Sequence, residues 1–419
     1  MKVFKFGGAS VKDSASIKNV ASILKLDEAD KKYIIISAIG KTTNALEDLV
    51  NSCFLGDGRA LERLNDIRKK HESIINELGL SGNENFNNAF NNFFTSVEWE
   101  IEDSDWSNFD KKYDQIVSLG ELVSTLIVSE YLKSIGLNNT WIDARDLIKT
   151  NSKYREGGIE WEQTELKVKA SLENFNKSNI IITQGFIGCD DENYTTTLGR
   201  EGSDYTASII AYCINAESMT VWKDVPGVLN ADPKWFDDTV LLEHLSYLDT
   251  IELAYYGATI LHPKTIKPLQ NKNIPLHVRS FIDPSKPGTV IDNNSQGLNI
   301  PSFIFKINQI LITISPKDFS FIVEHNLSDI FKSFSEHGVK INSMQNSAIS
   351  FSVCTDYDEK KILPLIESIR KRFKVLYNTG LELITIRYYD QQTIDRVMID
   401  KKLLVEVKSR HTVQLVVMP

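Results

Sequence analysis

The chain has 419 residues, 42% of them hydrophobic and 25% charged, which is enough for two or three soluble domains. Its formal net charge of −9 excludes a large basic groove for nucleic acid and disfavours an anionic membrane as a partner. No apolar run approaches the roughly 20 residues that span a bilayer, and the N-terminal run MKVFKF is typical of a strand, not of a signal peptide. We therefore expect a cytoplasmic protein, in which four scattered cysteines form neither a disulfide framework nor a zinc site.

The first part of the chain alternates short apolar runs with longer segments of helical spacing. Four runs rich in Ile, Val and Phe are typical of buried parallel strands: 3–6, 33–37, 179–184 and 218–222. Segments 16–26 and 117–132 have the apolar spacing of helices. This order predicts an α/β sandwich with a mostly parallel sheet. One stretch, 59–112, has no strand signals and is rich in Asn, Glu, Phe and Trp, so we interpret it as an inserted helical subdomain.

A glycine pair follows the first predicted strand, in the run KFGGASV at 5–11. Gly7 and Gly8 let backbone N–H groups approach an anion, and the N-terminus of the next helix adds partial positive charge. Lys5 can place a full charge on the same phosphate. The spacing of a Walker A loop is absent, and a Gly-Gly pair alone is more often a turn. The adjacent lysine and the helix start nevertheless favour a phosphate site.

A second motif, TTTLGREGSDYTA, occupies 195–207. Arg200 offers a bidentate fork for a carboxylate, and Ser203 offers a further donor. Asp204 would repel that carboxylate unless it has a cationic or metal partner. A lone aspartate here could equally be a helix-start residue favoured by the helix dipole. Beside Arg200 and Lys5 we favour the functional interpretation.

The composition changes at 283–301, where Pro, Gly, Asn and Ser cluster, which predicts a linker to a C-terminal module. Beyond it a strand, a helix, two strands and a helix are predicted at 303–315, 327–336, 339–344, 348–355 and 359–373. This is the order of a ferredoxin-like α+β unit. The tail has three more strand-like runs and room for one short helix, which is typical of a truncated second copy of this ferredoxin-like unit. We therefore predict domains at 1–290, 301–380 and 381–419.

Six ordered blocks of this sequence resemble the signature blocks of aspartate kinases, which belong to the amino-acid kinase superfamily. They are KFGGASV (5–11), SLGELVS (118–124), TQGFIG (183–188), TTLGREGSDYTA (196–207), WKDVPGVLNADPK (222–234) and YGATILHPKTI (256–266). The resemblance covers residues 2 to about 290 and implies an αβα amino-acid kinase fold there. It also implies transfer of the γ-phosphoryl group of Mg-ATP to the β-carboxylate of L-aspartate, the first step of lysine, threonine and methionine biosynthesis.

The resemblance assigns roles to the matching residues. Lys5 and Asp204 are implied to be catalytic, with Asp204 organising the lysine. The implied aspartate site has Glu121 for the amino group, Arg200 and Ser203 for the carboxylate, and a loop with Ser37 and Thr43 over the substrate. The implied nucleotide contacts are Lys5, Gly7, Gly8, Ser10, Lys223, Asp224, Leu229, Lys234 and Thr259.

Four positions depart from the pattern of the family. Glu201 stands where glycine is usual, Lys223 where threonine is usual, Leu229 where tyrosine is common, and Thr259 where lysine is usual. We expect these departures to affect the geometry of ATP binding more than the selection of aspartate as the substrate.

The chemistry itself supports the assignment, because phosphoryl transfer needs positioning and charge neutralisation more than covalent catalysis. A lysine and backbone donors can stabilise the transferring group while Mg²⁺ bridges the ATP oxygens. The acceptor carboxylate is already ionised at neutral pH, so no strong general base is required. His262, in LHP at a predicted helix start, is better explained by a structural hydrogen bond.

The C-terminal module resembles paired ACT domains, which sense end-product amino acids in these kinases. Ile341 and Asn342 fall near ligand-contacting positions of relatives, so the resemblance implies an amino-acid effector. A dimerisation module that binds no effector is the alternative. Either way we expect a homodimer, because the edge strands should pair with a second chain.

Two other functions remain as alternatives. One is a kinase for glutamate, acetylglutamate or UMP, which the 118–124 and 196–207 blocks argue against. The other is a silent amino-acid sensor, which Thr259 and Glu201 favour and the intact Lys5, Glu121 and Arg200 oppose. The length leaves no room for a fused homoserine dehydrogenase, so we expect a monofunctional enzyme.

Overall fold

The computed structural model describes residues 1–27, 29–258, 261–293, 300–318 and 320–419, and the chain divides into two compact units. The first unit consists of Met1–Val228, Glu243–Ile251 and Ile260–Gly297. The second consists of Leu229–Leu242, Glu252–Thr259 and Leu298–Pro419. Two short segments of the first 290 residues therefore belong to the second unit. The domain boundaries given above stay a prediction.

An eight-stranded sheet forms the centre of the first unit, in the order β3-β4-β2-β1-β7-β9-β10-β8. Its strands are β1 (Lys2–Phe6), β2 (Lys32–Ile36), β3 (Thr140–Trp141), β4 (Ile180–Gln184), β7 (Ser218–Lys223), β8 (His244–Ser246), β9 (Leu276–Ser280) and β10 (Thr289–Asp292). The pairings in the described chain are parallel except for β9 with β10. Strands β2 and β4 are buried throughout, which explains their continuous apolar sequence.

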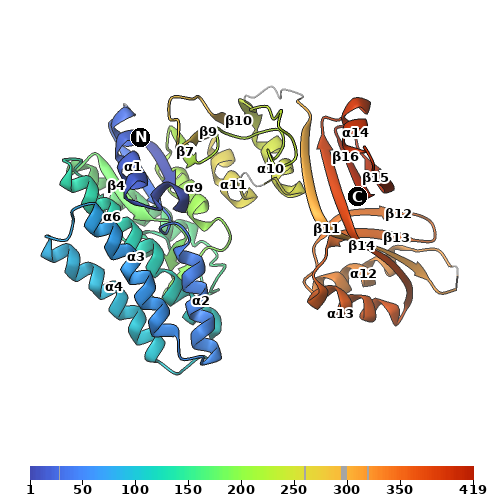
Figure 1. The fold of residues 1–419 in the computed structure, drawn as a ribbon, viewed down its shortest axis with the longest axis horizontal. Coiled ribbons are helices and arrows are strands. Elements are labelled where there is room, and N and C mark those ends of the chain that lie inside the picture. The colour runs from blue at the N-terminus through green and yellow to red at the C-terminus, as the bar shows by residue number, and fades with distance from the viewer. Residues whose placement is uncertain (28, 259–260, 294–299, 319) are drawn as a thin grey trace. The chain divides into compact units, whose positions relative to one another are not determined.

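Helices cover both faces of this sheet (Figure 1). Besides the helices within 59–117, the helices of this unit are η1 (Gly8–Val11), α1 (Ser14–Leu26), α2 (Thr42–Leu55), α6 (Leu119–Ser134), α7 (Ala144–Leu147), α8 (Trp161–Ser171), η2 (Leu172–Asn176), α9 (Gly202–Ile214) and α11 (Pro263–Lys272), and α10 (Tyr247–Tyr256) continues from it into the second unit. Side chains alternate along a strand, so Phe4 and Phe6 of β1 join the core beneath α1 and α6. Lys5 points to the opposite face, which α9 covers.

The segment 59–112 consists of helices joined by short loops, as the sequence predicts. It holds α3 (Ala60–Glu77), α4 (Glu84–Glu102) and the start of α5 (Phe109–Val117). Figure 1 shows α2, α3 and α4 side by side. Phe86, Phe90 and Phe94 recur every four residues along α4 and bury one face of that helix.

The second unit contains a six-stranded antiparallel sheet in the order β12-β13-β11-β14-β16-β15. The strands are β11 (Ser302–Pro316), β12 (Ile341–Asn346), β13 (Phe351–Asp356), β14 (Phe373–Arg387), β15 (Lys402–Lys408) and β16 (Thr412–Met418), with helices α12 (Glu324–Glu336), α13 (Glu359–Arg370) and α14 (Gln391–Val397). The tail strands join the same sheet beside β14, because β14 continues from its pairing with β11 to its pairing with β16.

The predicted fold class, an α/β sandwich with a mainly parallel sheet followed by ferredoxin-like α+β structure, is confirmed. The predicted strands and helices recur with ends shifted by a few residues. The segment 117–132 is the main change, because α5 ends at Val117 and a new helix, α6, begins at Leu119. In the described part of the chain, no helix combines the length and the apolarity needed to cross a membrane.

Candidate active site

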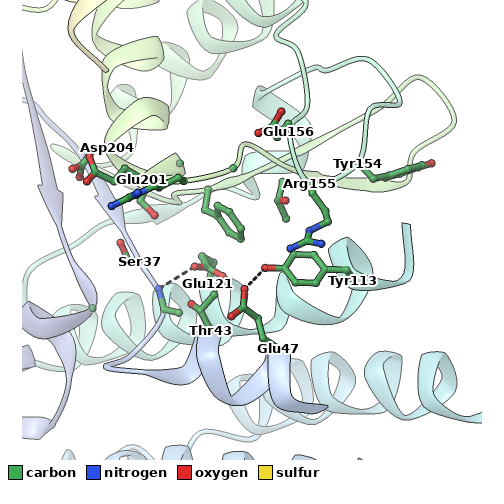
Figure 2. Close-up of a pocket in the computed structure, with 18 of the residues that line it drawn as sticks. Ser37, Thr43, Glu47, Tyr113, Glu121, Tyr154, Arg155, Glu156, Glu201 and Asp204 are labelled. Carbon is green, nitrogen blue, oxygen red and sulfur yellow. Dashed lines mark hydrogen bonds between the residues drawn. The ribbon is translucent and has the colours of Figure 1, made fainter. Parts of the chain in front are cut away.

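A cavity of about 890 Å³ in the first unit collects most of the residues selected from the sequence (Figure 2). Nine of them line it: Lys5, Gly8, Ser37, Thr43, Glu121, Arg200, Ser203, Asp204 and Lys223. They come from five segments spread over 219 residues of sequence, so folding alone brings them together. In Figure 2, Ser37, Thr43 and Glu121 lie along one side of the cavity, opposite Glu201 and Asp204.

A buried aspartate fixes two lysines at one end of the cavity. Nζ of Lys5 lies 2.7 Å from Oδ1 of Asp204, and Nζ of Lys223 lies 3.9 Å from Oδ2. Both lysines are at the carboxyl ends of neighbouring parallel strands, β1 and β7, and Asp204 is in the first turn of α9. Asp204 is only 3% exposed, and so deeply buried a carboxylate needs cationic partners. The arrangement therefore holds two positive charges in place beside the cavity.

Glycine at position 8 allows two loops of the cavity to touch. A Cβ atom at Gly8 would lie 2.7 Å from the carbonyl oxygen of Gly40 and 2.8 Å from that of Ala38. The amide of Gly40 instead donates to the carbonyl of Gly8 at 3.0 Å. At Gly7 a Cβ atom would lie 3.3 Å from Nζ of Lys5. Any larger residue at Gly8 would thus push the loop between Ser37 and the start of α2 away from Lys5.

Glu121 is in the first turn of α6 and is 2% exposed. Its Oε1 accepts a long hydrogen bond, 3.4 Å, from the amide of Ala38, and its Oε2 has no hydrogen-bond partner among the described residues. Burial raises the pKa of Glu121 to about 8. Among the described residues Glu121 forms no ion pair, and this suits it to receive an ammonium group from a ligand.

The turn between β6 and α9 carries the predicted carboxylate site. The hairpin of β5 (Ile187–Cys189) and β6 (Thr195–Thr197) leads into it, and Arg200 is exposed there. Ser203 is buried, and a side chain at Gly185 would collide with it. Glu201 has a φ of 54°, a left-handed conformation that costs a non-glycine residue about 1–3 kcal/mol. This conformation explains physically why glycine is usual at position 201.

Several predicted nucleotide residues do not line the cavity. Gly7 is next to the Lys5 ammonium group but is not part of the cavity lining. Oγ of Ser10 donates a hydrogen bond to the carbonyl of Trp222 at 3.3 Å, which connects η1 to β7. Asp224 is exposed just beyond β7. Leu229 and Lys234 belong to the second unit, and Thr259 lies outside the described residues. These assignments stay predictions.

One wall of the cavity was not recognised from the sequence. Oη of Tyr113 donates to Glu47 at 2.6 Å, and the guanidinium of Arg155 lies 4.3 Å above the Tyr113 ring (Figure 2). Behind them, fully buried Asp114 accepts hydrogen bonds from the amide of Arg155 at 2.9 Å and from the amide and hydroxyl of Thr197 at 2.8 and 2.7 Å. Burial raises the pKa of Asp114 to about 6. These residues form no sequence motif, since they meet only through contacts between α2, α5 and two loops.

The remaining predicted residues have structural partners. His262 Nδ1 accepts from the amide of Lys264 at 3.2 Å at the start of α11, so the predicted structural hydrogen bond is confirmed. In the second unit, Ile341 and Asn342 begin β12. The Asn342 side chain accepts from Lys306 at 2.8 Å and donates to Gln309 at 2.9 Å, so its amide is bonded within the chain. Within the described ranges, no three His, Cys, Asp or Glu side chains cluster as metal ligands would.

Comparisons with known proteins agree with this geometry. The profile of the amino acid kinase family matches residues 1–280. Bifunctional aspartokinase/homoserine dehydrogenase 2 of Arabidopsis thaliana is 30% identical over 396 residues, which are 90% of this chain and 42% of that protein. The chain thus spans about two fifths of such plant relatives.

A bacterial relative matches over more of its own length. Lysine-sensitive aspartokinase 3 of Escherichia coli is 31% identical over 362 residues, which are 84% of this chain and 78% of that protein. The solved structure of E. coli aspartokinase III in complex with aspartate and ADP has a TM-score of 0.83 at 25% identity, covering 100% of this chain and 96% of that one. The similarity therefore extends over both units.

Proposed function

Because the chain belongs to the amino acid kinase family, and within it to the aspartokinases, we propose that it transfers the γ-phosphoryl group of Mg-ATP to the β-carboxylate of L-aspartate, giving 4-phospho-L-aspartate. The observation that supports the proposal is the cavity, which Lys5, Lys223, Glu121 and Arg200 all line and at which Asp204 pairs with both lysines. The E. coli relative binds aspartate and ADP. This reaction would be the first step toward lysine, threonine and methionine.

At the phosphate end, the chain supplies fixed positive charge. Asp204 holds the ammonium of Lys5 in place, so this charge needs little reorganisation when negative charge moves onto the transferring oxygens. The start of η1 at Gly8 adds backbone donors. Mg²⁺ is usually held by one or two carboxylates together with substrate phosphates, and both oxygens of Asp204 already face lysines, so Mg²⁺ would be held chiefly by the ATP phosphates. When bound with ATP, Mg²⁺ neutralises charge on the phosphate oxygens.

At the acceptor end, the chain binds and orients aspartate. Glu121 receives the amino group and gives up its proton when it does so. Arg200 and Ser203 bind the α-carboxylate, while Ser37 and Thr43 position the side chain. The β-carboxylate of aspartate has an ordinary pKa near 3.9, so it is already a nucleophile at neutral pH. No residue has to remove a proton from it.

For the second unit we propose a role in dimer formation. Residues 373–378 of β14 pair with β11, and no second partner strand is present for them in the described part of the sheet. Leu376 and Tyr377 in this stretch are exposed. An amino-acid effector at Ile341 and Asn342 is the second candidate role, which the lysine sensitivity of the E. coli relative favours.

A coupled assay tests the reaction. ADP release should depend on aspartate and be absent with glutamate, acetylglutamate and UMP, and hydroxylamine should trap the acyl phosphate as a hydroxamate. Aspartate that raises the melting temperature without any ADP release would instead identify a silent sensor. Turnover with one of the other acceptors would identify a different kinase of the family.

A further inference from the structure

Arg155 is a cavity residue with an unusual backbone. Its φ is 64°, in the left-handed region that residues other than glycine rarely adopt. Its amide is fixed by the 2.9 Å hydrogen bond to buried Asp114. Strained backbone of this kind persists only where surrounding contacts hold it, and it concentrates at functional sites. Arg155 is therefore a candidate for a role in ligand binding, because it combines a strained backbone with a place in the cavity lining.

The segment of Arg155 lies directly beside the segment of Arg200. A Cβ atom at Gly199, the residue before Arg200, would lie 3.3 Å from the carbonyl oxygen of Arg155. The amide of Gly157 donates to the carbonyl of Thr197 at 2.8 Å, and Asp114 bonds to both segments. Arg155 and Arg200 thus belong to adjacent stretches of backbone that hydrogen bonds hold together, and both residues line one cavity.

The guanidinium of Arg155 is oriented but not strongly paired. It lies over the Tyr113 ring, whose hydroxyl is engaged with Glu47, so the ring provides a fixed platform. The guanidinium forms an ion pair with Asp110 at 3.5 Å, in which the two side chains are 46% and 57% exposed. Ion pairs this exposed contribute little, so a ligand carboxylate can compete for the guanidinium.

We propose that Arg155 is a specificity-determining residue that binds the α-carboxylate of the acceptor amino acid together with Arg200. This assignment rests on the proposed function. An amino-acid acceptor brings three charged groups to the cavity. Its ammonium group is repelled by an arginine, and its reacting carboxylate has to face Lys5. The α-carboxylate is the group that remains, and guanidinium forks bind carboxylates in a bidentate manner.

Three substitutions at one position test the assignment. Arg155→Gly removes the guanidinium and accepts the positive φ without strain. Arg155→Gln removes the charge but keeps a long side chain, and Arg155→Lys keeps the charge but loses the fork. Arg59→Gln is the matched control, because Arg59 is an exposed, aspartate-paired arginine outside the cavity. KM and kcat would be measured for aspartate and ATP, with calorimetric binding of aspartate and melting temperatures for each variant.

The glycine and glutamine variants should raise KM and Kd for aspartate by about tenfold to a hundredfold, the range expected for one charge-assisted contact. Their kcat and KM for ATP should stay within about threefold of wild type. The KM and Kd of the lysine variant for aspartate should lie between those of wild type and of the two neutral variants. The control variant should match wild type.

Several results would overturn the role of Arg155. They are aspartate affinity within twofold of wild type in both neutral variants, a loss in the glutamine variant alone, or a fall in kcat at unchanged KM. The second of these would show that the glutamine side chain itself, and not the loss of charge, is responsible. A wild type that neither binds nor phosphorylates aspartate would overturn the proposed function and this assignment with it, whereas an active wild type with unaffected variants would overturn the assignment alone.

Discussion

The proton on Glu121 allows a quantitative test of the acceptor site. Burial raises the pKa of Glu121 from 4.5 to about 8, so the carboxyl group is mostly neutral at pH 7 when no ligand is bound. The shift means that ionising Glu121 in the ligand-free protein costs at most about 5 kcal/mol more than ionising an ordinary glutamate. The cause is visible in the structure, since Glu121 has one long hydrogen bond and an Oε2 atom without a partner among the described residues.

Ligand binding should therefore release a proton. If the ammonium group of aspartate pairs with ionised Glu121, binding at pH 7 should release about 0.9 protons, the fraction bound by a group of pKa 8. Calorimetry in buffers of different ionisation enthalpy measures this number. Glu121→Gln should abolish the release and weaken aspartate binding by about a hundredfold, since it removes a buried ion pair. Glu130→Gln, on the same helix, is the matched control.

The same shift sets the pH dependence of stability. The folded-state pKa lies above the unfolded value, so the contribution of Glu121 is fully present below about pH 4.5 and is lost as the pH rises to 8. The free energy of unfolding of Glu121→Gln minus that of wild type should therefore increase by up to about 1.4 kcal/mol per pH unit between pH 5 and 8. Urea titrations at several pH values measure it. Parallel pH curves, together with a buffer-independent binding heat, would refute the reasoning.

Three further predictions follow from the two units. Lys5→Ala should lower kcat by several orders of magnitude and leave the calorimetric Kd for aspartate nearly unchanged, because its charge is needed most in the transition state; near-normal turnover would contradict this. Lysine and threonine should inhibit weakly or not at all, because Pro316 at the end of β11 provides no N–H donor and the Asn342 amide is already bonded; micromolar inhibition with a raised melting temperature would be the opposite result. Sedimentation should give a dimer of the 47.5 kDa chain, and Leu376→Asp on exposed β14 should shift it toward the monomer; a dimer that is unaffected would place the interface elsewhere.

Much of the fold could be predicted because its signals are local. The runs around Ile34 and Ile182 are continuously apolar because parallel strands are buried on both faces. The helical segment 59–112 is recognisable from its lack of strand signals and its richness in Asn, Glu, Phe and Trp. The sequence predicts one helix at 117–132, whereas α5 ends at Val117 and α6 begins at Leu119. This break was missed because the residues on both sides of it are apolar.

The sequence by itself determined the elements, the helix-start position of Asp204 and the residues that match a kinase motif, since propensity, apolar spacing and glycine patterns act over a few residues. Only the tertiary structure decided which of these residues share a cavity. It places Asp204 against Lys5 and Lys223, excludes Ser10 from the cavity wall, and adds Tyr113 and Arg155 through buried Asp114. The pKa of Glu121 is likewise a tertiary property, because desolvation depends on every segment packed around the carboxyl group and not on its neighbours in sequence.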